Sequence, residues 1–353
     1  MCSSDLGLVV RQEASAAMLR ERTHLPVILA ETFPELTDLY ARLDAGVVLY
    51  CNNSMLNFQS LLDHRKLHVH INHGESDKHS MASNNAKAYD RVFVAGEAAV
   101  QRYLTTLLEF DADRLVRIGR PQLDLQPERL LAPSTRRTVL YAPTWEGDAD
   151  YNNYTSVDLL GREIVEAALS LPGVRVVYKP HPKVTTSLTA SVREAHRAIC
   201  ALVEQAAERD PEAGHRSILA GDILAVIPDC DAMITDVSSV GLDWLYLRTD
   251  RPIFVTDRHR DADLLRAEVP VSRCADVLDA HEDADVASLA ALLAARLQHD
   301  EHHLARVAMR HHYFDDLQVG ESTVRFLEAV TELVVLRRSL LGEPHRDDSA
   351  HTA

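Results

Sequence analysis

Short apolar runs alternate with stretches of helical period along most of the chain. In its first third these runs are rich in residues that favour strands. They are "HLPVILA" (24–30), "AGVVLYC" (45–51), "LHVHI" (67–71) and "RVFVAG" (91–96). The stretch "EAAVQRYLTTLL" (97–108) follows the last run with the period of a helix. The pattern predicts strands that are linked by helices.

The second half repeats the pattern more clearly. Buried strands are predicted at "TVLYAPT" (138–144), "VRVVYKP" (174–180), "DAMITD" (231–236) and "RPIFVTD" (251–257). Helical segments are predicted at about 156–170, 188–208 and 239–247. Alternation of this kind implies parallel sheets with right-handed crossovers. Continuous apolar runs suit strands that are covered on both faces.

The stretch 120–138 separates two such units, because it is charged, aperiodic and contains proline. We therefore predict an α/β fold with two Rossmann-like domains, at 1–125 and 126–325, whose strand ends face a shared cleft. The amphipathic stretch 321–341 predicts a long helix, so residues 326–353 are expected to form a terminal helix and a disordered tail. The start "MCSSDLGLVV" lacks the features of a signal peptide and does not resemble a first α/β strand. We expect the amino-terminal domain to be truncated there.

Composition narrows the class of protein. The 353 residues suit two domains, and the net charge of −16 offers no overall basic field to nucleic acid or to an anionic membrane. Five cysteines without a CxxC pair argue against a disulfide framework or a zinc knuckle and fit a reducing compartment. No apolar run approaches the length of a membrane span. We expect a cytoplasmic protein, and local basic clusters leave open a peripheral contact with the membrane.

Five predicted strand-to-helix turns carry polar residues, at the position where parallel α/β sheets bind ligands. The turns are His73-Gly74, "YAPTWEGD" (141–148), "YKPHP" (178–182), "ITDVSSVGLDWLY" (234–246) and "VGESTVRFLEAV" (319–330).

The turn at 234–246 has the pattern of an anion site. Thr235 and Asp236 end a strand, and Ser238 and Ser239 begin the next helix. Free N–H groups at a helix start, together with serine hydroxyls, match a phosphate. The alternative is plain N-capping, which any helix start accepts.

The turn at 319–330 repeats this pattern, because Ser322 and Thr323 follow Gly320 at a predicted helix start. With Lys179, the two helix starts would hold a diphosphate with no metal and no cofactor.

His73 and His181 end strands in different predicted domains. If the domains face each other, the two imidazoles flank one phosphate, as a general base and as a hydrogen-bond donor. The alternative for each is a surface or capping histidine.

A further histidine cluster has helical i, i+3, i+4 spacing at His299, His302 and His303. It lacks an HExxH pattern, so a solvated helix face is favoured over a metal site. The sequence also lacks GxxxxGK[ST], GxSxG and a GxGxxG after a first strand, which removes support for P-loop, hydrolase and Rossmann dehydrogenase activities.

In this order, the turns resemble the CDP-glycerol glycerophosphotransferase family of teichoic-acid primases and polymerases. That family has a His-Gly pair, a Tyr-Ala-Pro-Thr-Trp strand end, a basic residue before His-Pro, Thr-Asp-x-Ser-Ser-x-x-x-Asp, and an Asp-Gly-x-[Ser/Ala]-[Ser/Thr] helix start. The matching residues are His73, Gly74, Tyr141 to Trp145 (which includes Thr144), Lys179, His181, Pro182, Thr235, Asp236, Ser238, Ser239, Asp243, Gly320, Ser322 and Thr323.

The likeness covers about residues 65–330 and implies a GT-B arrangement, with the acceptor bound by the first domain and the donor by the second. It implies transfer of a polyol phosphate from CDP-glycerol or CDP-ribitol to an acceptor hydroxyl, with release of CMP. The acceptor would be a lipid-linked polyol phosphate or a glycan. His73 matches the proposed base, and His181 matches a histidine that binds or stabilises the phosphates.

Three positions depart from the family pattern. Glu75 replaces the usual Thr after His-Gly, where it could orient His73 or raise its pKa and also suggests a different acceptor. Glu146 replaces an Arg, which removes a contact to phosphate or acceptor, and Val319 replaces the helix-start Asp. Two other functions stay open: a GT-B glycosyltransferase or nucleotide-sugar epimerase that uses a UDP-sugar, and a non-catalytic nucleotide-binding protein.

Overall fold

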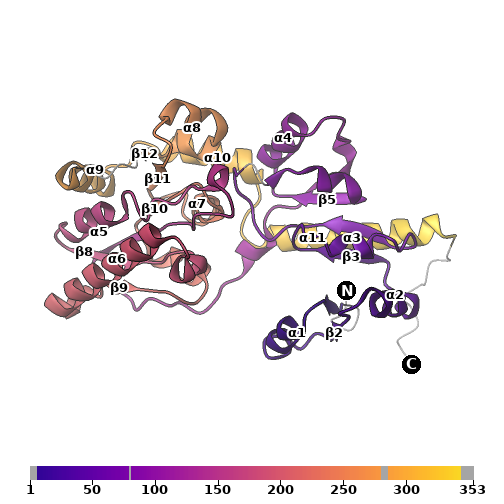
Figure 1. The fold of residues 1–353 in the computed structure, drawn as a ribbon. Helices are drawn as coiled ribbons and strands as arrows, with labels where there is room; N and C mark the ends of the chain where they lie inside the picture. The colour runs from indigo at the N-terminus through magenta and orange to yellow at the C-terminus, as the bar shows by residue number, and fades with distance from the viewer. Residues whose placement is uncertain (1–5, 79–80, 280–284, 343–353) are drawn as a thin grey trace, which may run out of the picture.

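The computed structural model describes residues 6–78, 81–279 and 285–342, which form two α/β domains and a long terminal helix (Figure 1). The predicted disordered tail lies outside these residues, apart from its first positions. Within the described residues, no helix is both long enough and apolar enough to cross a bilayer.

The amino-terminal domain contains two parallel sheets. One joins β1 to β2, and the other has the order β3-β4-β5-β6. The strands are β1 (Leu8–Val10), β2 (Val27–Leu29), β3 (Val47–Tyr50), β4 (Leu67–His70), β5 (Arg91–Val94) and β6 (Leu115–Arg117). The helices are α1 (Glu13–Arg20), α2 (Phe33–Arg42), α3 (Asn57–Ser60) and α4 (Glu97–Thr106).

The expectation that the first residues hold no strand is wrong. Leu8 to Val10 pair in parallel with Val27 to Leu29, and α1 connects the two strands. The strand is only three residues long and none of its residues is fully buried, so it leaves little apolar pattern in the sequence.

The carboxyl-terminal domain has a six-stranded parallel sheet with the order β12-β11-β10-β7-β8-β9. Its strands are β7 (Arg137–Ala142), β8 (Val174–Tyr178), β9 (Arg216–Ser217), β10 (Ala232–Thr235), β11 (Ile253–Asp257) and β12 (Asp276–Asp279). Its helices are α5 (Gly161–Leu169), α6 (Ala190–Arg209), α7 (Ser239–Leu247), α8 (Ala262–Glu268), α9 (Val286–Gln298) and α10 (His303–Phe314).

The order of this sheet reverses between β7 and β10. From β7 the chain adds strands on one side, and from β10 it adds them on the other. Parallel sheets bind ligands at such a switch point, outside the carboxyl ends of the strands. The turns after Ala142 and Thr235 are therefore the expected place for a site. Apolar clusters cover both faces of the sheet, as the continuous apolar runs predict.

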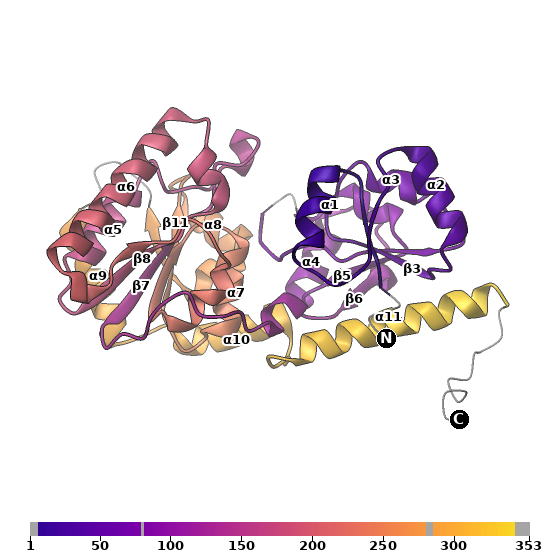
Figure 2. The same ribbon diagram turned by 90° about the horizontal axis from the view of Figure 1, so that it is seen from below.

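The last helix, α11 (Glu321–Leu340), returns to the amino-terminal domain and runs along its larger sheet (Figure 2). Ala329, Val330 and Leu333 of α11 pack against Val69 and Phe93. This confirms the predicted helix, and it shows that the start of α11, assigned from sequence to the second domain, lies at the junction of the two.

Candidate functional site

A cavity of about 570 Å³ lies between the two domains. Its amino-terminal wall includes His73, Gly74 and Lys78, and its carboxyl-terminal wall includes Thr144, Lys179, His181, Ser238 and Ser239. The structure thus brings together most of the predicted site residues, including the two histidines from separate domains. Gly74 and Ser239 meet where the domains touch, because a β-carbon at Gly74 would lie 3.5 Å from Ser239 Cβ.

His73 follows the end of β4 and is exposed to the cavity, and two hydrogen bonds fix its position. Asn72 before it has a left-handed backbone (φ 53°), and its side-chain Oδ1 accepts the His73 N–H at 2.8 Å. His73 Nδ1 lies 3.2 Å from the carbonyl oxygen of Cys51. A carbonyl only accepts, so Nδ1 carries the proton and Nε2 of the neutral ring keeps a lone pair. In this neutral tautomer Nε2 is free to accept a proton.

Lys78 follows His73 in the same loop and reaches across the cavity. Its ammonium donates to Thr144 Oγ1 at 3.3 Å. Burial lowers the pKa of Lys78, and the Asp236 carboxylate partly offsets this effect. Lys78 stands five residues after His73, but no local sequence pattern marks it as a site residue.

The loop that holds Lys78 is fixed by a buried ion network. Arg102 of α4 pairs with Glu75, and with Asp77 at 2.9 Å. Asp77 also accepts a hydrogen bond from the Tyr313 hydroxyl of α10, in the other domain. The expectation that Glu75 acts on His73 finds no support, because its carboxylate is directed to Arg102.

Lys179 and His181 follow β8 on the opposite wall. Lys179 is buried, and no hydrogen bond or ion pair joins its ammonium to another described residue. Burial lowers the pKa of Lys179, while Asp222 favours the charged form. A buried cation that faces a cavity without a bonded partner is suited to an anionic ligand.

His181 is a neutral donor at physiological pH. The His181 side chain is exposed to the cavity, yet desolvation by the surrounding walls and the ammonium groups of Lys78, Lys183 and Lys179 lower its pKa to about 4. His181 Nδ1 accepts the backbone N–H of Lys183 at 3.2 Å, so the proton of the neutral ring sits on Nε2. The ring stacks on Trp145, with 6.1 Å between centroids.

The start of α7 forms the floor beside these residues. Ser238 is its N-cap, and no side chain caps the first turn. Thr235 Oγ1 donates to the Ala142 carbonyl at 2.8 Å and lies 3.3 Å from Ser238 Oγ, which positions the serine. Uncapped amides at a helix start attract anions.

Asp236 lies fully buried behind the cavity and supports it. Its carboxylate accepts the Thr144 N–H at 2.7 Å and the hydroxyls of Ser156 and Thr256 at 2.5 and 2.6 Å. Burial raises the pKa of Asp236 to about 6, against these bonds. Asp236 and Thr235 therefore position the turns and do not line the cavity.

The second predicted helix start lies elsewhere. Asp124 accepts the N–H groups of Gly320 and Thr323, each at 2.6 Å, and the Thr323 hydroxyl at 2.7 Å. Ser322 Oγ accepts the Arg120 N–H at 3.1 Å. The N–H donors at this helix start are therefore already bonded to the carboxylate of Asp124. Gly320, Ser322 and Thr323 do not line the interdomain cavity.

The histidine cluster is divided between elements. His299 follows the end of α9, whereas α10 begins at His303. No group of three or more potential ligands that could hold a metal ion occurs among the described residues.

The chain matches a known protein family along most of its length. The profile of the family described as CDP-glycerol:poly(glycerophosphate) glycerophosphotransferase matches residues 61–332. No curated protein shows significant sequence similarity to the chain.

Solved structures share the fold at low identity. A putative UDP-N-acetylglucosamine 2-epimerase from Listeria monocytogenes has a TM-score of 0.59 and 14% identity, covering 96% of this chain and 89% of that one. A variant of the wall teichoic acid polymerase TagF soaked with CDPG has a TM-score of 0.54 and 14% identity, covering 89% and 79%. MnaA of S. aureus with UDP has a TM-score of 0.51 and 12% identity, covering 96% and 89%.

These neighbours confirm the predicted GT-B-type arrangement of two facing α/β domains. The matched profile extends over both domains, from the residue that follows α3 to the middle of α11. The chain therefore belongs to the CDP-glycerol:poly(glycerophosphate) glycerophosphotransferase family and is an enzyme of that type.

Proposed function

We propose that this enzyme transfers glycerol phosphate from CDP-glycerol to an acceptor hydroxyl and releases CMP, in the synthesis of a teichoic acid or a related cell-wall polymer. The observation that carries the proposal is the interdomain cavity itself. Its amino-terminal wall presents His73 and Lys78, and its carboxyl-terminal wall presents Lys179, His181 and an uncapped helix start. CDP-ribitol is an alternative donor of the same chemistry.

The donor diphosphate lies against the amides of Ser238 and Ser239, as the partial positive charge of α7 favours. Lys179 and Lys78 neutralise its charge from two sides. The Nε2–H of His181 donates to a phosphate oxygen, and the turn held by Asp236 keeps Thr144 beside Lys78. No metal takes part in this scheme.

The transfer step replaces a phosphoanhydride bond of the donor with a phosphoester bond to the acceptor. The acceptor oxygen forms a bond to the phosphorus that carries glycerol, and the bond from that phosphorus to the oxygen of CMP breaks. His73 Nε2 takes the proton of the acceptor hydroxyl, and CMP leaves with the electron pair of the broken bond. Catalysis of this kind rests on positioning and charge stabilisation, which fixed amides and lysines supply.

The acceptor approaches from the amino-terminal domain, because His73 belongs to that wall. A lipid-linked polyol phosphate or a glycan would present its terminal hydroxyl there. With such an acceptor the enzyme would act in the cytoplasm, at the inner face of the membrane.

A second candidate is a glycosyltransferase or epimerase that acts on a UDP-sugar, favoured by the fold shared with the epimerase and with UDP-bound MnaA. Calorimetry of the full chain with CDP-glycerol, CDP-ribitol and UDP-N-acetylglucosamine separates the candidates. We expect the CDP esters to bind and the UDP-sugar not to compete, and the reverse order would overturn the proposal. CMP release with a lipid-linked glycerol phosphate acceptor then separates an enzyme from a binding protein.

A further inference from the structure

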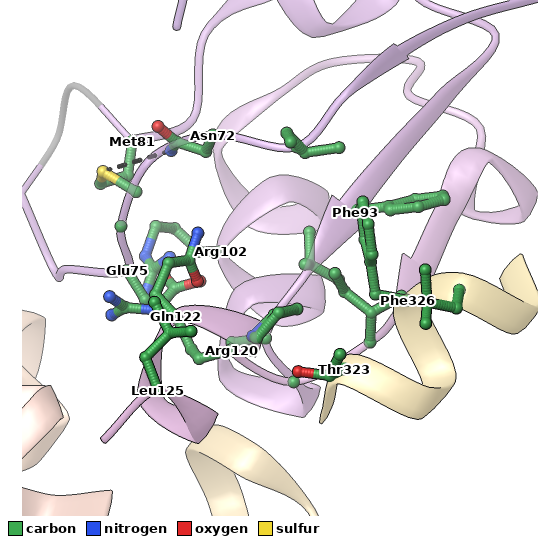
Figure 3. A pocket seen from close by; sticks show the side chains of 18 of the residues that line it. Asn72, Glu75, Met81, Phe93, Arg102, Arg120, Gln122, Leu125, Thr323 and Phe326 are labelled. Carbon is green, nitrogen blue, oxygen red and sulfur yellow. Dashed lines mark hydrogen bonds and ion pairs between the residues drawn. The ribbon is translucent and has the colours of Figure 1, made fainter. Parts of the chain in front are cut away.

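A second cavity, of about 350 Å³, lies within the amino-terminal domain beside the first (Figure 3). The carboxyl ends of β5 and β6, helix α4, the 3₁₀ helix η5 (Pro121–Asp124) and the first turns of α11 surround it. Its walls are mainly apolar and include Phe93, Ile118 and Phe326. Phe93 and Phe326 meet edge to face, with 6.0 Å between ring centroids.

The two cavities are neighbours. Asn72, Gly74, Glu75 and Met81 line both of them, and Asn72 and Gly74 are the residues on either side of His73. A ligand in the second cavity therefore lies next to the loop that carries His73, the proposed base.

The charges around the second cavity are already compensated. Arg102 pairs with Glu75 and Asp77, and Arg120 pairs with Asp243 at 2.8 Å. Paired guanidinium groups leave little attraction for a phosphate, so the cavity favours an uncharged ligand.

Two side chains of the wall carry buried polar atoms that make no hydrogen bond with another described residue. Besides Gln122 Oε1 these are Nε and Nη1 of Arg120, whose Nη1 makes only the ion pair with Asp243. Gln122 Oε1 is buried and accepts no hydrogen bond from another described residue. A buried amide oxygen favours a ligand with a donor such as a hydroxyl. Figure 3 shows Gln122 on the same side as Arg102 and Leu125.

The apolar wall also reaches the surface. Leu125 and Leu327 line the cavity, and they are 65% and 43% exposed. A ligand can thus extend from the loop of His73 to solvent beside Leu125 or beside Leu327.

We propose that the second cavity is the acceptor subsite, and that it binds an uncharged, mainly apolar segment of the acceptor, a ring or a short alkyl chain that also carries a hydroxyl. Only a few bonds separate this segment from the reacting hydroxyl. The hydroxyl can therefore reach His73 past Asn72 and Gly74 while the segment stays in the second cavity. Gln122 Oε1 accepts a hydrogen bond from the hydroxyl of this segment. The inference rests on the proposed function, because it takes His73 as the base that receives the acceptor. Ligand cavities of roughly 300–1,000 Å³ hold small organic groups, and this one is near the lower limit.

The test uses glycerol monoalkyl ethers with chains of one to ten carbons, with the full chain as protein. Calorimetry measures their affinity, and CMP release from CDP-glycerol with a glycerol phosphate acceptor measures competition. We expect the dissociation constant to fall by about three- to fourfold for each added methylene, until the chain passes Leu125 and Leu327 into solvent. The ethers should compete with the acceptor and not with CDP-glycerol.

Substitution of the cavity mouth supplies the control. Leu327→Trp and Leu125→Trp, which lie on different elements, should each abolish the dependence on chain length. Leu336→Trp, on the same helix but outside the cavity and 36% exposed, should retain it. Gln122→Leu should weaken ether binding by about two- to tenfold at every chain length. Thermal melting verifies that each variant is folded.

The outcomes separate the two proposals. The subsite proposal is overturned if the affinity for the ethers does not depend on chain length. It is also overturned if the dependence on chain length is the same in the Leu125→Trp and Leu327→Trp variants as in the parent chain. Binding that does not compete with the acceptor also overturns it, since the cavity would then hold a different ligand. If the ethers bind as expected but CDP-glycerol neither binds nor yields CMP, the proposed function fails, and with it the acceptor role, while the apolar cavity stands as a ligand site.

Discussion

Lys78 of the amino-terminal domain donates to Thr144 of the carboxyl-terminal domain, with 3.3 Å between Nζ and Oγ1. The bond spans the cavity between the domains, so the ammonium is placed over the site proposed for the diphosphate. Four predictions follow from this and neighbouring contacts.

Lys78→Met should lower the affinity for CDP-glycerol by about ten- to a hundredfold, because a hydrogen bond to a charged group contributes about 1.5–3 kcal/mol. Calorimetry measures the effect. Lys87→Met removes the same charge at an exposed position outside the cavity and should leave the affinity unchanged. Equal effects of the two variants would mean that net charge, and not the position of Lys78, governs binding.

His73→Gln should reduce CMP release by about 10²- to 10⁴-fold, the range typical of general-base catalysis. Donor affinity should change little, because His73 lies on the acceptor wall. His64→Gln, at an exposed histidine outside the cavity, serves as the matched control. Full activity of the His73 variant with an authentic acceptor would falsify the assignment of the base.

His181 should contribute to the loss of stability in acid. Its pKa is about 4 in the folded chain, below its ordinary value of 6.5, so the unfolded chain binds more protons between these values. Stability therefore rises with pH across this window and falls as pH drops from about 6.5 to about 4. His181→Gln should lose less stability than the parent chain between pH 7 and pH 5 in thermal melts.

Buried His70, whose pKa is also lowered to about 4, acts in the same direction and stays in the variant. The difference between the two melting curves thus reports His181. An identical acid response of parent and variant would mean that His181 keeps its ordinary pKa in the folded chain.

Arg102→Met should destabilise the fold by about 3–5 kcal/mol, because it leaves Glu75 and Asp77 buried without their cation. Denaturant unfolding measures the change. Adding Glu75→Gln and Asp77→Asn should recover part of the loss, since neutral amides need no counter-charge.

Arg117→Met is the control, because its pairs with Glu97 and Asp315 are at the surface. Exposed pairs contribute about 0–1 kcal/mol. Similar costs for Arg102 and Arg117 would show that burial does not determine the energy of these pairs.

Local patterns select residues that the structure places along the cavity, because of how parallel sheets are built. Lys179, His181 and Ser238 follow buried strands with clear apolar runs, and the carboxyl ends of such strands lie at one edge of the sheet. Predicting the residues that line the edge requires only local patterns and this rule. The same logic placed His73 on the opposite wall.

Local sequence patterns do not predict contacts between segments that are far apart in the chain. Ser322 and Thr323 have the local signature of an anion site, but the carboxylate that binds that helix start belongs to Asp124, about 200 positions earlier in the chain. In the same way, Glu75 looks like a partner for His73 until α4 brings Arg102 to it. Side-chain reach, as for Lys78, also leaves no periodic signal.

The bonds from Asp124 to Gly320 and Thr323 join the two places where the chain passes from one lobe to the other. The first crossing leads out of η5 and the second leads into α11, and the carboxylate ties them side by side. Two crossings that are tied side by side form a single joint between the lobes, which is the geometry of a hinge. Release of CMP would then need only a rotation about this joint that widens the interdomain cavity.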